Sequence, residues 1–286
     1  NVLPAKTNIS LQLTKKIRLK VPFLTSAMDT VTEYSMAVAI AKEGGIGIIH
    51  RNLSSQNQSK EVFKVKKKKL VVGAAVGTNK EDIDRAKMLL DSGCDLIVID
   101  TAHGHSEKVL KSLSKLKKIN GEIPICVGNI ATAEAAKKLF DSGADIIKVG
   151  IGPGSICTTR MVAGIGVPQI SAIIEVKKAL NKKKIKIISD GGIKFSGDIA
   201  KALAAGADAV MVGSMLAGTS EAPGKIIKKK GKLFKVFRGM GSVGAMNKGS
   251  ADRYFQKKQK DKSKYVPEGV EGLIKYKGDV SKTINK

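Results

Sequence analysis

A cysteine in a glycine-rich segment is the residue of this chain best suited to covalent chemistry. Residues 150–160 read Gly-Ile-Gly-Pro-Gly-Ser-Ile-Cys-Thr-Thr-Arg, which places Cys157 among hydroxyl side chains and close to Arg160. The attacking species is a thiolate, which nearby N–H groups and cations favour. Cys94 and Cys126 instead lie within or beside apolar stretches. We therefore expect Cys157 to be a nucleophile and the other two cysteines to be packing residues.

Two further segments are suited to binding phosphate. Asp190 is followed by the pair Gly191-Gly192, and a Gly213-Ser214 step follows later in the chain. Adjacent glycines let backbone N–H groups approach phosphate oxygens, and the N-terminus of a following helix favours an anion. A tight turn without a ligand is the alternative interpretation of the glycine pair. Both glycine segments follow predicted strands, and this position favours a phosphate-binding site over a simple turn.

An internal repeat predicts the elements that hold these segments. Residues 89–100, 139–150 and 203–213 share one pattern, in which a helix end and a glycine precede a short buried strand. Glycine suits the left-handed conformation that closes a helix, and apolar strands are typical of a parallel sheet covered on both faces. The pattern extends to eight strands, at residues 22–25, 46–49, 71–75, 96–99, 123–127, 146–149, 185–189 and 209–212. Segments of helical period lie between them, for example residues 81–90, 133–140 and 198–204.

Strands that alternate with helices predict an α/β fold with parallel crossovers. Eight units favour closure into a (β/α)8 (TIM) barrel, which takes roughly 250 residues. An open doubly wound sheet is the alternative, and the lack of a Gly-x-Gly-x-x-Gly fingerprint in the first unit weakens it. Barrels carry their active sites at the C-terminal strand ends and often bind phosphate after strands seven and eight. We expect the catalytic barrel over residues 1–217, with a long flap region of the same domain over residues 218–286.

Composition restricts the class of protein. The formal net charge is +26, but the lysines are spread over predicted helices and aromatic residues make up only 4% of the chain. A nucleic-acid partner is therefore not favoured, whereas attraction of an anionic small substrate is compatible with this charge. No apolar run approaches the ~20 residues that cross a membrane, no secretion leader is recognisable, and the three cysteines are odd in number. We expect a cytoplasmic protein without a membrane anchor.

Seven segments, taken in order, resemble the IMP dehydrogenase family, whose members oxidise IMP to XMP with NAD in guanine nucleotide biosynthesis. They are residues 26–33, 45–50, 100–106, 150–160, 189–193, 238–242 and 253–255. GMP reductase, which deaminates GMP to IMP with NADPH, is the nearest alternative, but residues 26–28, 253–254 and 267–269 favour the dehydrogenase. A catalytically silent nucleotide-binding barrel is a further alternative, and it needs neither Cys157 nor Arg253.

The resemblance implies a two-stage reaction. In the first stage Cys157 attacks C2 of the purine, and hydride leaves that carbon for NAD. In the second stage water hydrolyses the covalent thioimidate. Arg253, Tyr254 and Thr159 activate this water under a flap that closes over the site. The implied IMP contacts are Ser26, Met28, Ser155, Asp190, Gly191, Gly192, Gly213, Ser214, Phe237, Gly239, Met240, Gly241 and Glu268. The implied NAD contacts are Asp100, Thr101, Asn129, Gly150, Ile151 and Gly152.

The resemblance also implies a potassium ion on the backbone carbonyls of Gly152, Gly154 and Cys157. Further ligands come from a neighbouring subunit in the family, which implies a homotetramer. Two departures stand out. The family usually has a tyrosine at the position of Phe237, so one contact with the IMP phosphate is expected to be missing. The regulatory Bateman (CBS) domain pair is expected to be missing near residues 66–70, where the predicted helix runs straight into the third strand.

Overall fold

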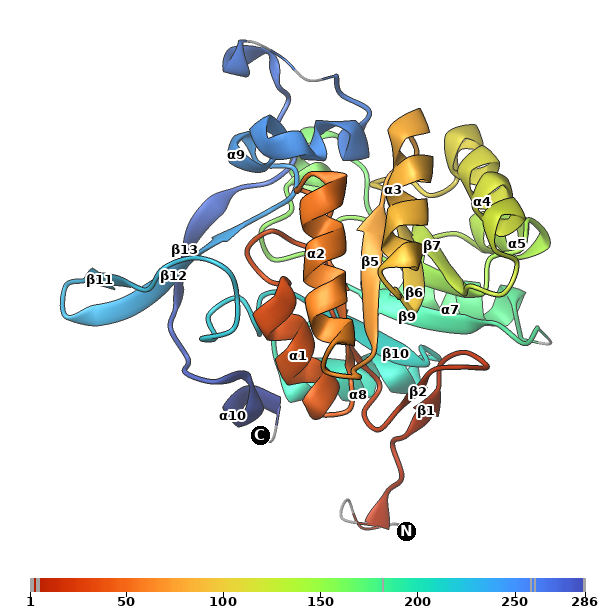
Figure 1. Cartoon of the computed structure of the whole chain (residues 1–286), viewed down its shortest axis with the longest axis horizontal. Helices are drawn as coiled ribbons and strands as arrows, with labels where there is room; N and C mark the ends of the chain where they lie inside the picture. Colours follow the sequence, from red (N-terminus) through yellow and green to blue (C-terminus); the bar gives the residue numbers. More distant parts are fainter. Residues whose placement is uncertain (1–2, 4–5, 182, 258, 260, 285–286) are drawn as a thin grey trace.

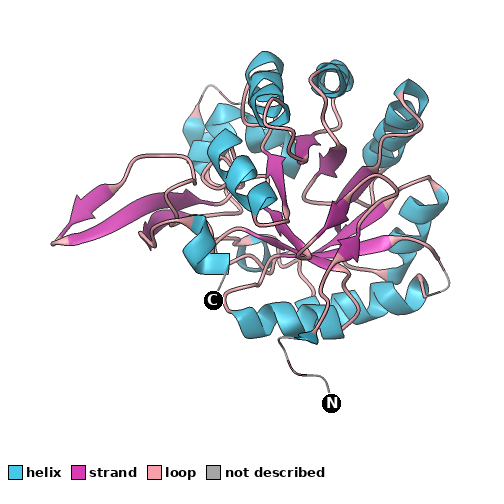
Figure 2. Ribbon diagram, turned by 60° about the horizontal axis from the view of Figure 1, so that its bottom comes forward, coloured by secondary structure: helices cyan, strands magenta, loops and turns pink. Residues whose placement is uncertain are grey.

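The computed structural model describes residues 3, 6–181, 183–257, 259 and 261–284. Eight parallel strands close into a barrel in the order β10-β3-β4-β5-β6-β7-β8-β9, and Figure 2 shows helices around it. The predicted barrel is therefore confirmed. Its strands are β3 (Phe23–Thr25), β4 (Ile46–Ile49), β5 (Val72–Val76), β6 (Leu96–Asp100), β7 (Ile125–Ile130), β8 (Ile146–Val149), β9 (Lys186–Asp190) and β10 (Ala209–Val212).

The helices alternate with the strands, except that two helices, α6 and α7, lie between β8 and β9. Those of the barrel are α1 (Tyr34–Lys42), α2 (Ser55–Lys66), α3 (Lys80–Asp91), α4 (Glu107–Ile119), α5 (Ala133–Asp141), the short α6 (Thr159–Val162), α7 (Gln169–Ala179) and α8 (Ser196–Ala204). Only residues 67–71 connect α2 to β5, so no further domain lies between them in this chain. The largest error in the predicted strands is at β7, which starts two residues later than expected, after Pro124, a residue without an N–H for the ladder.

The repeat has a physical basis at the N-terminal ends of the strands. Gly93, Gly143 and Gly206 each close a helix with a positive φ, of 85°, 93° and 117°, as the sequence predicted. The acidic residue two positions after each glycine accepts a hydrogen bond from the backbone of the preceding strand. For example, Asp95 accepts from the Val72 N–H at 2.9 Å, and Asp145 accepts from the Ile125 N–H at 2.8 Å. The repeated glycine and acid thus set the register between helix ends and neighbouring strands.

The inside of the barrel is a packed core, closed at one end by the N-terminal hairpin. Strands β1 (Leu11–Gln12) and β2 (Arg18–Leu19) pair antiparallel. Their neighbourhood contributes Leu13, Ile17 and Leu19 to the apolar cluster that fills the barrel. The N-terminal end of the barrel is therefore sealed by side chains, and ligands must approach the other end.

The region after residue 217 holds a regular sheet that the sequence did not predict. Strands β11 (Ile227–Lys229), β12 (Lys232–Arg238) and β13 (Glu271–Lys275) form an antiparallel sheet, and its β11–β12 hairpin extends away from the barrel in Figure 1. Lys230 and Gly231 make the turn with positive φ values of 47° and 73°, as in a type I′ hairpin. Lysines at alternate and adjacent positions obscured the strand pattern here. β12 leads directly into residues 239–241, which belong to the site described below.

The chain between β12 and β13 lies across the barrel. It contains α9 (Val243–Ala245), η2 (Met246–Ser250), η3 (Ala251–Tyr254) and η4 (Lys262–Lys264), and the chain ends after α10 (Val280–Ile284). In Figure 1 this segment lies at the opposite side of the view from the N-terminus. Within the described residues, no helix has both the length and the apolar character needed to cross a membrane.

Candidate active site

One pocket collects nearly all of the residues that the sequence singled out. It lies at the C-terminal ends of the barrel strands and is covered by Phe237, Gly239, Met240, Arg253, Tyr254 and Glu268. Every predicted catalytic, substrate, cofactor and cation residue lines this pocket except Gly241. Gly241 lies just behind the wall, where its carbonyl accepts the Glu268 N–H at 3.0 Å. It supports the segment that carries Glu268.

Cys157 is half-buried and heads a short chain of polar groups. Its thiol is within hydrogen-bond distance, 3.2 Å, of the Thr159 hydroxyl, which donates in turn to the Glu268 carboxylate at 2.8 Å. The other two cysteines are buried, and burial raises the pKa of each thiol to about 12. Cys157 is therefore the cysteine that a ligand in the pocket can reach. A proton from its thiol can pass through the Thr159 hydroxyl to the Glu268 carboxylate.

The loop that carries Cys157 is held by a distant part of the chain. The Thr158 N–H donates to the Glu268 carbonyl at 2.9 Å, and the Val270 N–H donates to the Ile156 carbonyl at 3.0 Å. These two bonds form a bridge between Cys157 and Gly269. The bridge places the thiol at a fixed height over the strand ends, although more than a hundred residues separate the two segments.

The predicted phosphate-binding glycines lie against the cysteine loop. Gly191 and Gly192 have φ values of 93° and 80°, and a Cβ on Gly191 would come within 2.8 Å of the Pro153 side chain. Both positions therefore require glycine, for the conformation and, at Gly191, for the close approach. The thiol loop and the glycine pair share one pocket, as a thiol acting on a phosphate-bearing substrate requires.

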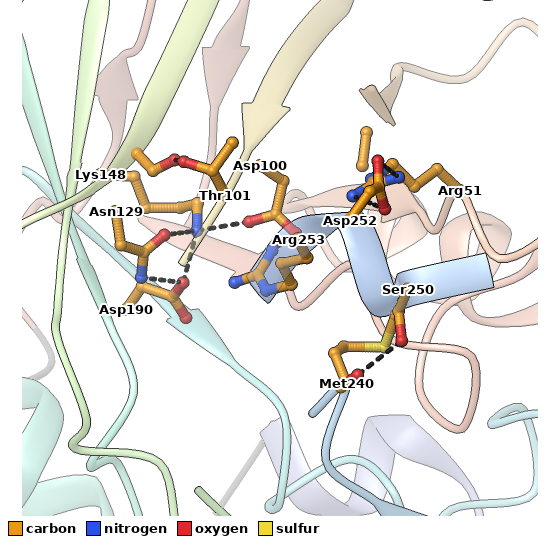
Figure 3. Close-up of polar contacts among 12 residues, drawn as sticks. Arg51, Asp100, Thr101, Asn129, Lys148, Asp190, Met240, Ser250, Asp252 and Arg253 are labelled. Atoms are coloured by element: carbon orange, nitrogen blue, oxygen red, sulfur yellow. Dashed lines mark hydrogen bonds and ion pairs between the residues drawn. The ribbon is translucent and has the colours of Figure 1, made fainter. Parts of the chain in front are cut away.

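The floor of the pocket is a compact polar cluster on four neighbouring strands, β6 to β9. Asp100 ends β6, Asn129 lies in β7, and Asp190 ends β9. Lys148 of β8 lies among them, with only 1% of its surface exposed, and its ammonium group donates to all three (Figure 3). Sequence reasoning missed Lys148. The available signal was a single charged residue in an otherwise apolar strand, two positions after the interior residue Ile146 and therefore on the same face.

Arg253 and Tyr254 lie over the same floor. One guanidinium nitrogen of Arg253 pairs with the second oxygen of Asp100, and the Arg253 carbonyl accepts the Ala102 N–H at 3.1 Å. Burial lowers the pKa of Arg253, although the neighbouring Tyr254 opposes this, and burial raises the pKa of Tyr254. Beside them, Asp252 makes a salt bridge with Arg51 of the barrel at 2.9 Å, which the sequence did not predict. The segment that carries Asp252, Arg253 and Tyr254 is therefore docked on the pocket.

A buried ion pair ties two of the predicted substrate segments together. Arg238, just before Gly239, donates to both oxygens of Asp29, just after Met28, at 3.0 and 2.5 Å. Burial alone would raise the pKa of Asp29, but the hydrogen bonds from Arg238 and Asn52 hold it below its usual value. The pair thus fixes the strand-end loop after β3 against the loop after β12.

We expect Arg238→Gln to lower the free energy of unfolding by about 3 kcal/mol, because it leaves the buried Asp29 charge without its main partner. Thermal and urea denaturation measure this loss, and the affinity for the substrate should fall with it. Lys16→Gln is the matched control, since its partner Glu122 is exposed and its loss should leave the midpoint unchanged. Equal effects of the two variants would show that the Asp29 pair does not hold the loops.

Phe237 lies where the resemblance implies a tyrosine. It lines the pocket with 6% of its surface exposed and carries no hydroxyl. The resemblance implies IMP as the ligand, and we expect Phe237→Tyr to tighten its binding about fivefold, the value of one added hydrogen bond of about 1 kcal/mol. Calorimetric titration with IMP tests this, with Phe234→Tyr on the same strand as the control. An unchanged affinity in Phe237→Tyr would place the phosphate elsewhere.

A closed (β/α)8 barrel with a reachable thiol beside a glycine pair, at the C-terminal strand ends, defines a barrel enzyme that acts on a phosphate-bearing substrate. The family model described as "IMP dehydrogenase / GMP reductase domain" matches residues 1–286. The chain therefore belongs to the IMP dehydrogenase / GMP reductase family.

Curated relatives agree with this assignment. The chain is 48% identical to inosine-5'-monophosphate dehydrogenase of Cryptosporidium parvum, over 98% of this chain and 80% of the relative. It is 46% identical to the enzyme of that name from Borreliella burgdorferi, over 97% and 81%. It is 38% identical to the one from Bacillus subtilis, over 99% and 84%. The chain is an oxidoreductase of this family.

Proposed function

We propose that the protein oxidises IMP to XMP with NAD and so serves guanine nucleotide biosynthesis. The observation that carries this proposal is the single pocket that joins Cys157, the glycine pair and the docked Arg253–Tyr254 segment. The relatives named above are all inosine-5'-monophosphate dehydrogenases, whereas a deamination by GMP reductase has no named relative among them. A silent binding protein has no need of this thiol.

The first stage is addition of the Cys157 sulfur to C2 of the purine, followed by loss of hydride from that carbon. The bound dinucleotide supplies the acceptor for this hydride. The Thr159 hydroxyl lies within hydrogen-bond distance of the thiol and donates to the Glu268 carboxylate, so the proton released on forming the thiolate can reach an acceptor in the pocket through this hydroxyl. Splitting one difficult step into two through a covalent intermediate is what such a nucleophile provides.

The two halves of the pocket suit the two ligands. Asp190 keeps one carboxylate oxygen free of hydrogen bonds among the described residues and can accept from ribose hydroxyls, while Gly191, Gly192, Gly213 and Ser214 surround the place of the phosphate. On the other side, Asp100, Thr101, Asn129 and the backbone of 150–152 fit the nicotinamide end of NAD. A Cβ on Gly150 would lie 2.0 Å from the Asp190 carbonyl, so this wall is bare backbone.

The second stage is hydrolysis of the thioimidate. Water attacks C2, the C–S bond breaks, and Cys157 recovers its proton as XMP leaves. Arg253 and Tyr254 are the candidates to take the proton of this water, together with Thr159. Burial lowers the pKa of Arg253, which favours such a role, and its Nε has no hydrogen-bond partner among the described residues. We therefore assign Arg253 and Tyr254 to the flap, within the region of residues 218–286.

We further propose that a potassium ion binds the carbonyls of Gly152, Gly154 and Cys157, since backbone carbonyls are suited to this ion. Met161, Val162 and Ile165, just after the cysteine loop, expose 85%, 49% and 59% of their surfaces, which fits burial against another copy in a homotetramer. Cysteine usage supports a cytoplasmic location. Residues 1–217 would form the catalytic barrel, with 218–286 its extension and the Bateman domain pair missing near 66–70.

A spectrophotometric assay tests the function. The purified protein is mixed with IMP and NAD in potassium buffer, and the absorbance of NADH is followed. GMP with NADPH is the counter-assay. Formation of NADH with XMP as the product supports the proposal, and consumption of NADPH with GMP alone would replace it by GMP reductase. Activity in neither assay would favour a silent binding protein.

A further inference from the structure

Lys148 is the most deeply buried charged group near the reaction centre, and the reaction scheme above does not use it. Its ammonium group lies 2.6 Å from one oxygen of Asp190 and 3.0 Å from one oxygen of Asp100, and it also contacts the side-chain oxygen of Asn129 (Figure 3). A lysine has three N–H donors, so all three are used. A buried cation with this many partners is held in one position.

The contacts leave each carboxylate with one oxygen for another partner. The oxygen of Asp190 that contacts Lys148 also accepts the Asn129 amide at 2.9 Å, and no described residue donates to its other oxygen. The other oxygen of Asp100 pairs with Arg253. Asp190 thus offers an acceptor to the nucleotide half of the pocket, and Asp100 offers one to the cofactor half. Lys148 is the group that both carboxylates share.

The charges of the cluster balance only with the flap docked. Lys148 and Arg253 are positive, and Asp100 and Asp190 are negative. Withdrawal of Arg253 leaves one net negative charge on the floor of the pocket. The oxidised nicotinamide ring carries a positive charge, and the reduced ring is neutral. The same Asp100 oxygen therefore suits the oxidised cofactor before hydride transfer and Arg253 after it.

We propose that Lys148 is a positioning residue that couples the two halves of the pocket, because it orients Asp190 toward the ribose and limits the floor to a single unpaired negative charge. This inference rests on the proposed function for the identity of the two ligands. Without the ammonium group, two buried carboxylates face one another and both lose their common anchor. The loss should therefore appear in the affinities for both ligands, because Lys148 contacts both carboxylates.

The test uses Lys148→Met in the full chain. We expect the Kd for IMP, measured by calorimetry, and the KM for NAD each to rise roughly tenfold or more, the effect of losing a hydrogen bond to a charged group. Double variants test whether the effect of Lys148 acts through Asp190 and Asp100. Lys148→Met added to Asp190→Asn should weaken IMP binding no further than Asp190→Asn alone, and Lys148→Met added to Asp100→Asn should do the same for NAD.

Lys235→Met is the matched control. Among the described residues Lys235 is also a lysine with only 1% exposure, and its ammonium group contacts the backbone carbonyls of residues 219, 220 and 222, away from the pocket. This variant should unfold at a lower temperature, while the folded protein keeps its affinity for IMP. Lys148→Gln, which retains an amide donor without the charge, is measured in parallel in case Lys148→Met does not fold, and the same losses are expected.

Each outcome is decisive. A folded Lys148 variant that binds IMP and NAD as the unaltered protein does, or losses that add fully to those of Asp190→Asn and Asp100→Asn, would overturn the positioning role. Failure of the proposed function looks different, because the unaltered protein itself would then form no NADH from IMP.

Discussion

Replacement of Cys157 by alanine is expected to abolish NADH formation from IMP, with a loss of about 10⁴-fold or more. The reason is that hydride leaves a carbon already bonded to sulfur, so no later step can proceed without the thiol. Binding of IMP should remain, because the glycine pair and Asp190 are untouched. Stopped-flow absorbance measures the first stage, and calorimetry measures the binding.

Cys94→Ala is the matched control for this prediction, since Cys94 is buried away from the pocket. Alkylation gives an independent measurement. A thiol reagent should label Cys157 alone, because burial raises the pKa of Cys94 and Cys126 to about 12, and IMP should protect it. NADH formation at an ordinary rate by Cys157→Ala would remove the covalent mechanism altogether.

Replacement of Arg253 by alanine is expected to leave a burst of one NADH per active site and to slow later turnover by about 10² to 10⁴-fold, the contribution of a general base. The burst should persist because Arg253 contacts Asp100 and the flap rather than the thiol. Rapid-mixing absorbance with the enzyme at a concentration similar to that of NADH separates the two phases. Mass spectrometry should then show the purine nucleotide attached to Cys157.

Lys248→Ala provides the control for the flap, because Lys248 is exposed on the same segment and should leave both phases unchanged. Loss of the burst itself in Arg253→Ala would contradict the assignment, since it would give Arg253 a role in hydride transfer. A normal steady-state rate would assign activation of the water to other groups, with Thr159 and Glu268 the nearest.

Much of the fold could be predicted because short, local sequence patterns mark its helix ends and strands. Gly93, Gly143 and Gly206 mark helix ends, and the strands that follow them are short and buried, so repeat counting found the barrel. The sheet of β11, β12 and β13 was missed for the opposite reason. β12 pairs with β13 over a long separation in the chain, and the many lysines of the sheet hide the alternation that marks a half-buried strand.

The site likewise has parts that local sequence motifs predict and parts that they do not. The residue types on the strand-end loops were recognisable as motifs, and the fold brought them into one pocket. The contacts that position them were not recognisable, since Asp29 with Arg238 and Cys157 with Gly269 join residues far apart in the chain. Lys148 was missed because one charge within a short apolar strand gives no indication of its partners until neighbouring strands are aligned.

The N-terminal hairpin beneath the barrel has a consequence for the traffic of molecules. Leu13, Ile17 and Leu19 close the N-terminal end of the barrel, so among the described residues the pocket opens at the C-terminal strand ends, where substrates must enter and products must leave. The docked segment that bears Arg253 lies across this opening. The reduced dinucleotide must therefore go out by the passage through which the hydrolytic water comes in, and the two events have to take turns.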